Sequence, residues 1–395
     1  MSTVQPTLDR ADRLQPGTTV YFDHAATTPV DPRVFDAMRP FLTDVFGNPS
    51  SVYRIARESR RFVDAARDEV ASLLGAKSSE VIFTGSGTES VNAAIKGVAF
   101  AHGAGGHIVT TQIEHHAVLN TTHFLEKLGY RVTYLPVDGV GRVDPDAVGR
   151  AICDDTILVS IMYANNEIGT IQPIAEISGI TRSRQVPLHV DAVQAGGSLD
   201  VGVDRLGADL LSLSGHKFGG PKGTGILFIR RGTVCWPLIH GGGQERGRRA
   251  GTENVAGIVG FSEAFRLAQS ERPERTSSVA ALRDRLIKSV LENVSRSRLT
   301  GHPTDRLPGN ASFVIDSISG ESLLIALDQR GIMASSGSAC TSGSLEPSHV
   351  LLAIGLDDKL ARGSLRISLG HSNNQKEVDH FLALLPGLVH SIESA

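Results

Sequence analysis

The chain has 395 residues, enough for two or three domains, and its 39 Lys and Arg nearly balance its 42 Asp and Glu to give a formal charge of −3. This balance disfavours a dedicated nucleic-acid binder, because there is no basic excess to hold a phosphate backbone. Three cysteines are too few for a disulfide framework, no apolar run approaches the ~20 residues of a membrane span, and the start is polar. We therefore expect a cytoplasmic protein rather than a membrane or secreted one.

The first predicted elements are a polar arm, a short strand and a long helix. Residues 1–20 lack apolar periodicity, which indicates a loosely held N-terminal arm before the strand-like residues 21–23. Apolar and small residues then recur every three or four positions from Ser51 to Leu74. This spacing predicts an amphipathic helix that ends at Gly75.

Short β-rich runs alternate with helical stretches through the middle of the chain. The alternation predicts βαβ units and an α/β fold in which helices cover a large, mostly parallel sheet. Ligands of such sheets bind beyond the carboxyl ends of the strands, so we expect the chemistry in the loops that follow these runs. The predicted strands are 81–84, 107–111, 131–137, 156–162, 187–193, 209–214 and 225–230.

The texture changes after about Phe261. A long charged helix runs through 281–294, β-rich runs follow at 311–316 and 364–370, and a final helix starts from Asn374. This pattern predicts a smaller α+β domain joined by the first strand. We expect a large domain of residues 28–270 and a small domain of residues 21–27 plus 271–395.

Two polar residues follow predicted buried strands. Lys217 lies among glycines that admit close approach of a ligand, which suits a Schiff base with an aldehyde cofactor; a glycine-rich turn with a solvated lysine is the alternative. Asp191 lies toward the end of the run 187–193, where a carboxylate would keep the nitrogen of a pyridoxal ring protonated. An aspartate that caps a loop is the alternative there.

A phosphate cradle is predicted in the loop 85–90, where Gly87 and Thr88 open a predicted helix with free backbone amides. The loop is not a P-loop, because it has no lysine before a Ser or Thr. The G-x-G-x-x-G pattern of a dinucleotide site is also absent from the first βα turn. The cradle therefore favours a small phosphorylated cofactor.

One histidine and one thiol stand out. A neutral His115 could stack on a cofactor ring and pass protons, whereas the histidines and cysteines lack the spacing of a metal site, so we expect no metal. Cys340 lies in the small-residue run 335–344, where a thiol is accessible and can form a nucleophilic thiolate. Cys153 and Cys235 are more typical of structural cysteines.

Two further side chains suit a carboxylate ligand. The fork of Arg366 suits a bidentate substrate carboxylate, and the amide of Asn166 suits a cofactor oxygen or that same carboxylate. Neither residue is informative alone. Together with the lysine, the aspartate, the cradle, the histidine and the thiol, they require one explanation.

The chain resembles the NifS/IscS-like cysteine desulfurases, which are aminotransferase class V enzymes of pyridoxal-phosphate fold type I. The resemblance runs from Tyr21 to the C-terminus and is carried by the combination of SGHK at 214–217, HVDAVQ at 189–194 and SSGSACTS at 335–342. It implies a large cofactor domain, a smaller domain formed by both chain ends, and a homodimer.

The resemblance also implies a role for each matching residue. Around the ring of pyridoxal 5'-phosphate, Lys217 would bind the aldehyde, Asp191 the pyridine nitrogen and Gln194 the ring oxygen, while His115 would stack. The implied phosphate ligands are Thr88, Ser214 and His216, with Thr252 from the other subunit. The implied substrate contacts are Asn166 and Arg366, with Asn48 nearby.

The implied activity converts L-cysteine to L-alanine and transfers the sulfur to Cys340 as a persulfide, then to an acceptor or iron–sulfur scaffold protein. One alternative is a selenocysteine lyase, or another class V lyase or aminotransferase, which would not need Cys340. Another is a catalytically idle scaffold in a sulfur-assembly complex. A desulfurase could also serve tRNA thiolation, DNA phosphorothioation or a sulfur-containing metabolite instead of general iron–sulfur assembly.

Overall fold

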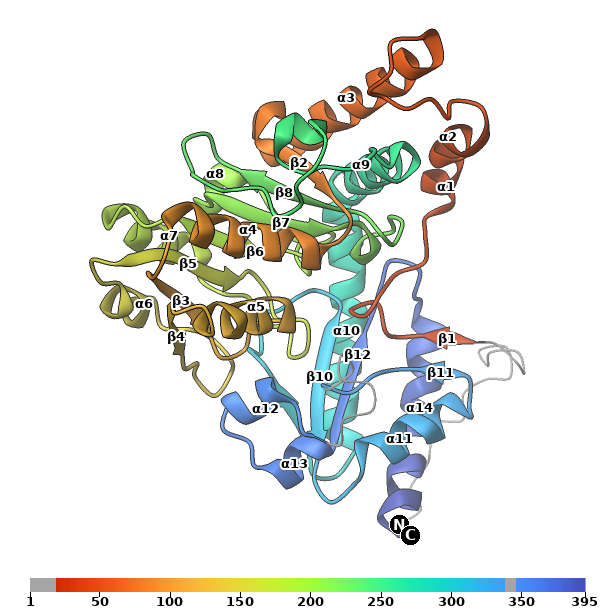
Figure 1. Cartoon of the computed structure of the whole chain (residues 1–395). Helices are drawn as coiled ribbons and strands as arrows, with labels where there is room; N and C mark the ends of the chain where they lie inside the picture. Colours follow the sequence, from red (N-terminus) through yellow and green to blue (C-terminus); the bar gives the residue numbers. More distant parts are fainter. Residues whose placement is uncertain (1–18, 338–345, 395) are drawn as a thin grey trace, which may run out of the picture.

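The computed structural model of the chain describes residues 19–337 and 346–394. The N-terminal arm, apart from Thr19 and Val20, therefore lies outside the described residues, and so does Cys340. Two sheets of different size dominate the architecture, with helices packed around each of them (Figure 1). The predicted α/β fold, with a large mostly parallel sheet and a smaller α+β part, is confirmed.

The large sheet has seven strands in the order β2-β8-β7-β6-β5-β3-β4. β8 is antiparallel to both of its neighbours, and the remaining pairs are parallel. All seven predicted strands are present, shortened by up to three residues where the chain turns into a loop. Their bounds are β2 (Val81–Thr84), β3 (His107–Thr111), β4 (Arg131–Leu135), β5 (Thr156–Met162), β6 (Leu188–Asp191), β7 (Leu210–Ser214) and β8 (Gly225–Ile229).

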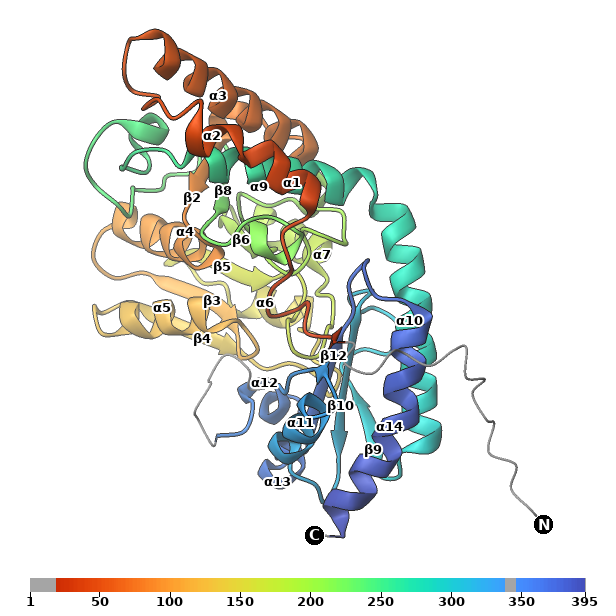
Figure 2. The same ribbon diagram turned by 90° about the vertical axis from the view of Figure 1, so that its right-hand side faces the viewer.

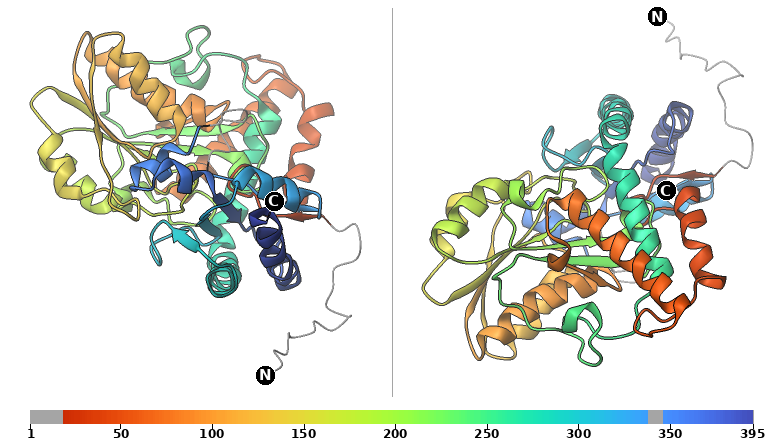
Figure 3. Two further views of the ribbon diagram at one scale, coloured as in Figure 1. Left: turned by 90° about the horizontal axis from the view of Figure 1, so that it is seen from below. Right: turned by 90° about the horizontal axis from the view of Figure 1, so that it is seen from above.

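Most strand residues of this sheet are buried, because helices cover both of its faces. One core lies under α4 and α5, and the other lies under α3, α7 and α9; Figure 3 shows α3 beside α9. The helices of this part are α1 (Pro32–Met38), α2 (Pro40–Thr43), α3 (Arg54–Leu74), α4 (Gly87–His102), α5 (His116–Glu126), α6 (Pro145–Ala151), α7 (Ile174–Ser183), α8 (Val203–Leu206) and α9 (Val255–Ser270).

The helix predicted from Ser51 begins instead at Arg54. Both oxygens of Asn48 accept backbone N–H groups, from Ser50 at 3.0 Å and from Ser51 at 3.0 Å, and this turn delays the helix. Its predicted end is confirmed, because Gly75 follows Leu74 in the left-handed region at φ 69°.

A three-stranded antiparallel sheet, in the order β12-β10-β9, forms the smaller part. Its core includes residues of α10, α11 and α14, and Figure 2 shows α10 and α14 side by side. β1 and β11 form a separate parallel pair. The elements of this part are β1 (Val20–Tyr21), α10 (Arg272–Asn293), β9 (Ser297–Thr300), β10 (Asn310–Ile315), α11 (Gly320–Asp328), β11 (Ile332–Met333), α12 (His349–Ala353), α13 (Asp358–Arg362), β12 (Ser364–Ser368) and α14 (Gln375–Glu393).

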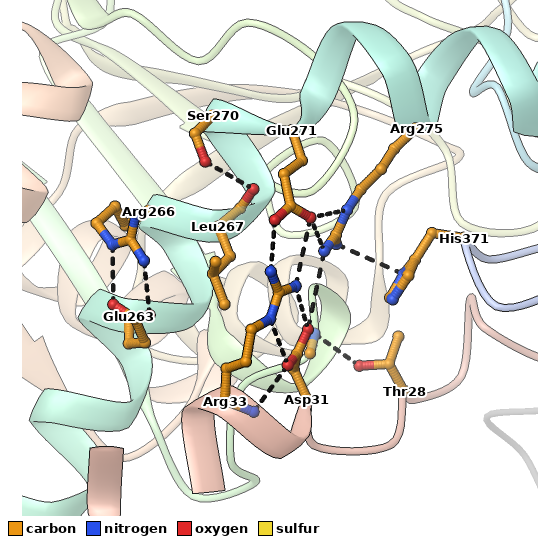
Figure 4. Close-up of polar contacts among 11 residues, drawn as sticks. Thr28, Asp31, Arg33, Glu263, Arg266, Leu267, Ser270, Glu271, Arg275 and His371 are labelled. Carbon is orange, nitrogen blue, oxygen red and sulfur yellow. Dashed lines mark hydrogen bonds and ion pairs between the residues drawn. The ribbon is translucent and has the colours of Figure 1, made fainter. Parts of the chain in front are cut away.

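The two parts meet where α9 ends and α10 begins. Glu271 separates the helices and accepts from Arg33 at 2.6 Å and from Arg275 at 2.8 Å (Figure 4). Arg33 also pairs with Asp31, and Arg275 approaches His371 of the smaller part at 3.5 Å. The long helix predicted to run through 281–294 is α10, which begins at Arg272, where Pro273 suits a helix first turn. The division into domains at residues 28 and 271 stays a proposal.

Candidate functional site

Lys217 lies at the carboxyl end of β7, in the short 3-10 helix η3 (Gly215–Lys217). Its Nζ donates to the carbonyl oxygens of Ala25 at 2.6 Å and Ala26 at 2.9 Å. Gln194, beyond β6, donates from Nε2 to the same Ala25 oxygen at 2.9 Å. The segment after β1 therefore joins two predicted site residues from neighbouring strand ends.

Asp191 is the last residue of β6 and is 6% exposed. Its Oδ1 accepts the N–H of Val193 at 3.0 Å. Burial raises its pKa to about 6, and the hydrogen bond and the Lys217 charge oppose that shift. A buried carboxylate close to an amine has the chemistry needed to hold a protonated ring nitrogen.

His115 is the N-cap of α5, and its Nδ1 accepts the N–H of Ala117 at 3.0 Å. Since Nδ1 acts as the acceptor, the neutral ring carries its proton on Nε2. Burial, together with the Lys217 charge, lowers the pKa of His115 to about 4. The ring is therefore a neutral Nε2–H donor near pH 7.

The first turn of α4 forms the predicted cradle. The hydroxyl of Ser86 caps this helix by accepting the N–H of Glu89 at 3.0 Å. A Cβ on Gly87 would lie 2.7 Å from Val193 Cγ2 and 3.1 Å from Ser214 Cβ. Only glycine lets the first-turn amides approach the ends of β6 and β7 this closely.

His216 and Thr88 complete the predicted phosphate ligands of this chain. Nδ1 of His216 lies 3.1 Å from Thr27 Oγ1. Burial and the Lys217 and Lys222 charges lower the pKa of His216 to about 4, so its ring is neutral near pH 7. Thr88 is exposed in the first turn of α4, where its hydroxyl is accessible to a ligand.

Arg366 lies in β12 of the smaller sheet and is 2% exposed. Its Nη2 pairs with Asp23 Oδ1 at 2.7 Å, and its Nη1 donates to the Asn166 carbonyl at 3.2 Å. Its Nε is buried and has no hydrogen-bond partner among the described residues. The predicted substrate residues Arg366 and Asn166 are thus brought together from the two sheets.

Neither Asn48 nor Thr252 lines the cavity that reaches Lys217 in this chain. Arg60 of α3 joins their neighbourhoods, because it donates to the Pro49 carbonyl at 3.4 Å and to Glu253 at 2.6 Å. Thr252 itself is exposed and lines a cavity of about 230 Å³, which Gly85 of the cradle loop also lines.

Two buried carboxyl groups that lie next to predicted site residues were not identified from the sequence. Glu114 precedes His115, is fully buried, and has an Oε2 that finds no partner within the described chain; burial raises its pKa to about 8. Glu167 follows Asn166, and burial raises its pKa to about 7. Their positions next to predicted site residues are the signal that could have identified them.

A cavity of about 370 Å³ reaches Lys217 between the two parts of the molecule. Its lining also includes Gln194, His24, Arg275 and His371. Within residues 19–337 and 346–394, no group of three or more His, Cys, Asp or Glu residues is arranged to hold a metal ion. No described helix is long and apolar enough to cross a membrane.

The chain is similar to characterised families and solved structures along most of its length. The aminotransferase class-V family profile matches residues 20–381. Cysteine desulfurase IscS of Methanosarcina thermophila is 53% identical over 376 residues, which cover 95% of this chain and 93% of that protein. A solved NifS-like protein has a TM-score of 0.89 at 40% identity, covering 95% of this chain and 100% of its own. SspA in complex with cysteine has a TM-score of 0.81 at 38% identity, covering 90% and 100%.

Proposed function

Since the chain belongs to the aminotransferase class-V family, we propose that it is a pyridoxal-phosphate-dependent cysteine desulfurase that forms L-alanine and a persulfide on Cys340. The main structural support for this proposal is that Lys217 and Gln194 both donate to the Ala25 carbonyl beside the buried Asp191. The names of the relatives, cysteine desulfurase IscS and a cysteine complex, support this choice within the family.

The residues at this sheet edge fit pyridoxal phosphate. An amine on Lys217 suits its aldehyde, a buried carboxylate on Asp191 suits its pyridine nitrogen, and the closely packed α4 amides beside Ser214 suit its phosphate. Gln194, His115, His216 and Thr88 would complete the site. When bound, the cofactor supplies an electron sink for charge that develops at the substrate Cα.

Lys217 Nζ is the proposed base that removes the Cα proton from L-cysteine. Asp191 would hold the ring nitrogen in its protonated form, because burial raises the pKa of its carboxyl group and a cationic partner would stabilise the carboxylate. His115 would have its Nε2–H free to donate in the proton transfers of the reaction, because its Nδ1 already accepts the Ala117 N–H. Arg366 orients the substrate through its carboxylate, beside Asn166.

The sulfur step balances without an external oxidant. The Cys340 thiolate attacks the substrate sulfur, the Cβ–S bond breaks, and an S–S bond forms. Cβ keeps the electron pair and is protonated, so L-cysteine and the Cys340 thiol become L-alanine and a persulfide. The persulfide sulfur would then pass to an acceptor protein, an iron–sulfur scaffold protein in the first instance.

A homodimer is part of the proposal. The segment from α1 to the start of α3 exposes large apolar side chains, and such a patch is typical of an interface. Asn48 lies within this segment and Thr252 lies near it, and both would serve the partner's site. The exposed side chains are Phe35, Leu42, Phe46, Val52 and Tyr53, each more than half exposed.

The test combines a visible spectrum with product analysis. Purified protein with pyridoxal phosphate should show a band near ~410–420 nm, as expected of a lysine-bound cofactor, and should yield equal alanine and sulfide from L-cysteine under reductant. Lys217→Ala should lose the band and the turnover. Cys340→Ser should keep the band and lose both products.

Each contrary result selects an alternative. Alanine formation that survives Cys340→Ser would favour a lyase or aminotransferase that needs no thiol. Failure of the wild-type protein to bind pyridoxal phosphate would favour the scaffold. Pull-down with a trapped Cys340 persulfide would identify the acceptor, and recovery of only an iron–sulfur scaffold protein would count against a specialised pathway.

A further inference from the structure

Glu89, in the first turn of α4, uses both carboxylate oxygens to join two loops. Its Oε2 accepts the N–H of Gly85 at 2.8 Å. Its Oε1 accepts Nε of Arg249 at 2.9 Å, and Nη2 of Arg249 lies 3.3 Å from Oε2. One carboxylate therefore connects the predicted phosphate loop to a segment more than 150 residues away in the sequence.

The Gly85 side of this contact is sterically specific. A Cβ on Gly85 would lie 2.8 Å from Glu89 Oε2 and 3.7 Å from Arg249 Nη2. The residue must therefore be glycine while Glu89 keeps this position. Because Glu89 engages the Gly85 N–H and Ser86 caps the Glu89 N–H, the loop is closed by its own residues just before the Gly87 amide.

The Arg249 side of the contact leads to Thr252. Nearby backbone groups fix this segment, since Ala250 N–H donates to the Ile239 carbonyl at 3.2 Å and Gly251 N–H donates to Gln244 Oε1 at 3.1 Å. Gly85, Arg249 and Thr252 all line the cavity of about 230 Å³. The ion pair therefore lies between the cradle and the segment that carries Thr252.

Partial burial makes this ion pair stronger than an open surface pair. The Glu89 side chain is 16% exposed and that of Arg249 is 27% exposed. Screening by solvent is reduced at such positions, and the Gly85 N–H adds a charge-assisted hydrogen bond. The Glu89 carboxylate neutralises the Arg249 charge, so Arg249 is better suited to positioning than to direct binding of an anion.

We propose that Glu89 and Arg249 are positioning residues for the phosphate group of the cofactor. Glu89 sets the shape of loop 85–90 in the site of its own chain, and through Glu89 the side chain of Arg249 fixes the segment whose Thr252 would serve the site of the partner subunit. This inference rests on the proposed function, because it assumes a phosphorylated cofactor at the cradle. It assigns a specific task to two residues that touch no reacting atom.

The test compares two ligands that differ only in the phosphate. Cofactor-free full-length protein is titrated with pyridoxal phosphate and with pyridoxal, following the visible band of each. Glu89→Gln and Arg249→Gln should each weaken binding of pyridoxal phosphate roughly tenfold, as expected for loss of hydrogen bonds to a charged group. Binding of pyridoxal should stay within about twofold, because it has no phosphate to be positioned.

The matched control is the ion pair between Glu263 and Arg266 on α9, with a distance of 2.7 Å and partly exposed side chains (Figure 4). Glu263→Gln and Arg266→Gln should leave both affinities unchanged. In a double-mutant cycle, Glu89→Gln with Arg249→Gln should be no weaker than either single variant, because each removes the same pair.

Several results would overturn the inference. If the binding of both ligands is weakened equally, the substitutions have damaged the site in general. If pyridoxal phosphate binding is unchanged, the ion pair of Glu89 and Arg249 is dispensable for it. If a glutamine variant fails to fold, Arg249→Lys replaces it, because this variant keeps the charge and loses the fork. It should weaken binding of pyridoxal phosphate and leave that of pyridoxal unchanged. A wild-type protein that binds neither ligand would refute the proposed function itself, which distinguishes the two failures.

Discussion

The carboxyl edge of the large sheet and the three-stranded sheet contribute different halves of the site. The large sheet supplies Asp191 and Lys217 from the ends of the adjacent strands β6 and β7, and the predicted cradle from the end of β2. The smaller sheet supplies Arg366 on β12. The proposed cofactor half therefore belongs to one sheet, whereas the proposed substrate contacts depend on how the two sheets are placed against each other.

A small set of hydrogen bonds joins these halves. Arg366 donates to the Asn166 carbonyl, Ser348 donates to the buried Glu167, and His349 Nε2 lies 3.0 Å from the Glu114 carbonyl. Ser348 and His349 begin α12, so this helix is attached directly beside two predicted site residues. Substitutions at the large sheet should therefore affect the rate of the reaction. Substitutions at the hydrogen bonds that join the halves should affect substrate binding and stability.

The largest effect is expected within the cofactor half. Asp191→Asn removes the carboxylate that is proposed to hold the ring proton, so alanine formation should fall by at least about 10²-fold while the KM for L-cysteine changes little. The measurement is steady-state alanine production. Asp209→Asn is the matched control, because Asp209 accepts the Leu188 N–H at the opposite edge of the same sheet. Near-normal turnover of Asp191→Asn would contradict the assigned role.

The next effect is expected in the substrate half. Arg366→Lys keeps the charge but loses the fork, so the KM for L-cysteine should rise roughly tenfold. The visible band of the cofactor should be unchanged, because Lys217 and Asp191 lie on the other sheet. Arg306→Lys controls for loss of a buried arginine, since Arg306 is 3% exposed and donates to the Asn310 carbonyl. A KM unaffected by Arg366→Lys would remove this residue from substrate binding.

The pH dependence of stability should reveal the buried carboxyl groups that lie at the hydrogen bonds between the two halves. Burial raises the pKa of Glu114 from 4.5 to about 8, so the folded protein binds this proton more tightly than the unfolded chain. The stability that results is complete below pH 4.5 and is lost as the pH rises through about 8. The neutral histidines His115 and His216 titrate between about 4 and 6.5, so the window above pH 6.5 isolates the carboxyl groups.

The measurement is the unfolding temperature of the cofactor-free protein between pH 6.5 and 8. Wild-type protein should lose stability across this window, and Glu114→Gln should lose less. Glu176→Gln, at an exposed position on α7, is the control and should follow the wild type. An identical slope for Glu114→Gln and wild type would show that Glu114 does not titrate there.

The smallest effect is expected at the start of α12. Ser348 accepts the N–H groups of Val350 and Leu351 and donates to Glu167, so Ser348→Ala should lower the free energy of unfolding by ~1 kcal/mol. Denaturant unfolding measures this change. Ser319→Ala removes the comparable cap of α11 and should have a similar cost in stability. Only Ser348→Ala should also slow alanine formation, and equal activity of the two variants would separate this joint from catalysis.

The local elements were predictable because their signals are local. Short β-rich runs identified all seven strands of the large sheet, and Gly75 marked the end of α3. The start of α3 was wrong by three residues, since the Asn48 turn has no apolar signal. The roles of the site residues stay predictions, and neither Thr252 nor Asn48 lines the cavity that reaches Lys217.

The sequence by itself determined the strand order along the chain and the placement of Lys217, Asp191 and the cradle at strand ends. Only the tertiary structure decided their partners. The Ala25 carbonyl meets Lys217 across 192 residues, and Asp23 meets Arg366 across 343. It also decided that Glu114 and Glu167 are buried and hold raised pKa values. The physical reason is that strand and turn patterns arise from neighbouring residues, whereas burial and long-range pairing depend on how complete elements pack.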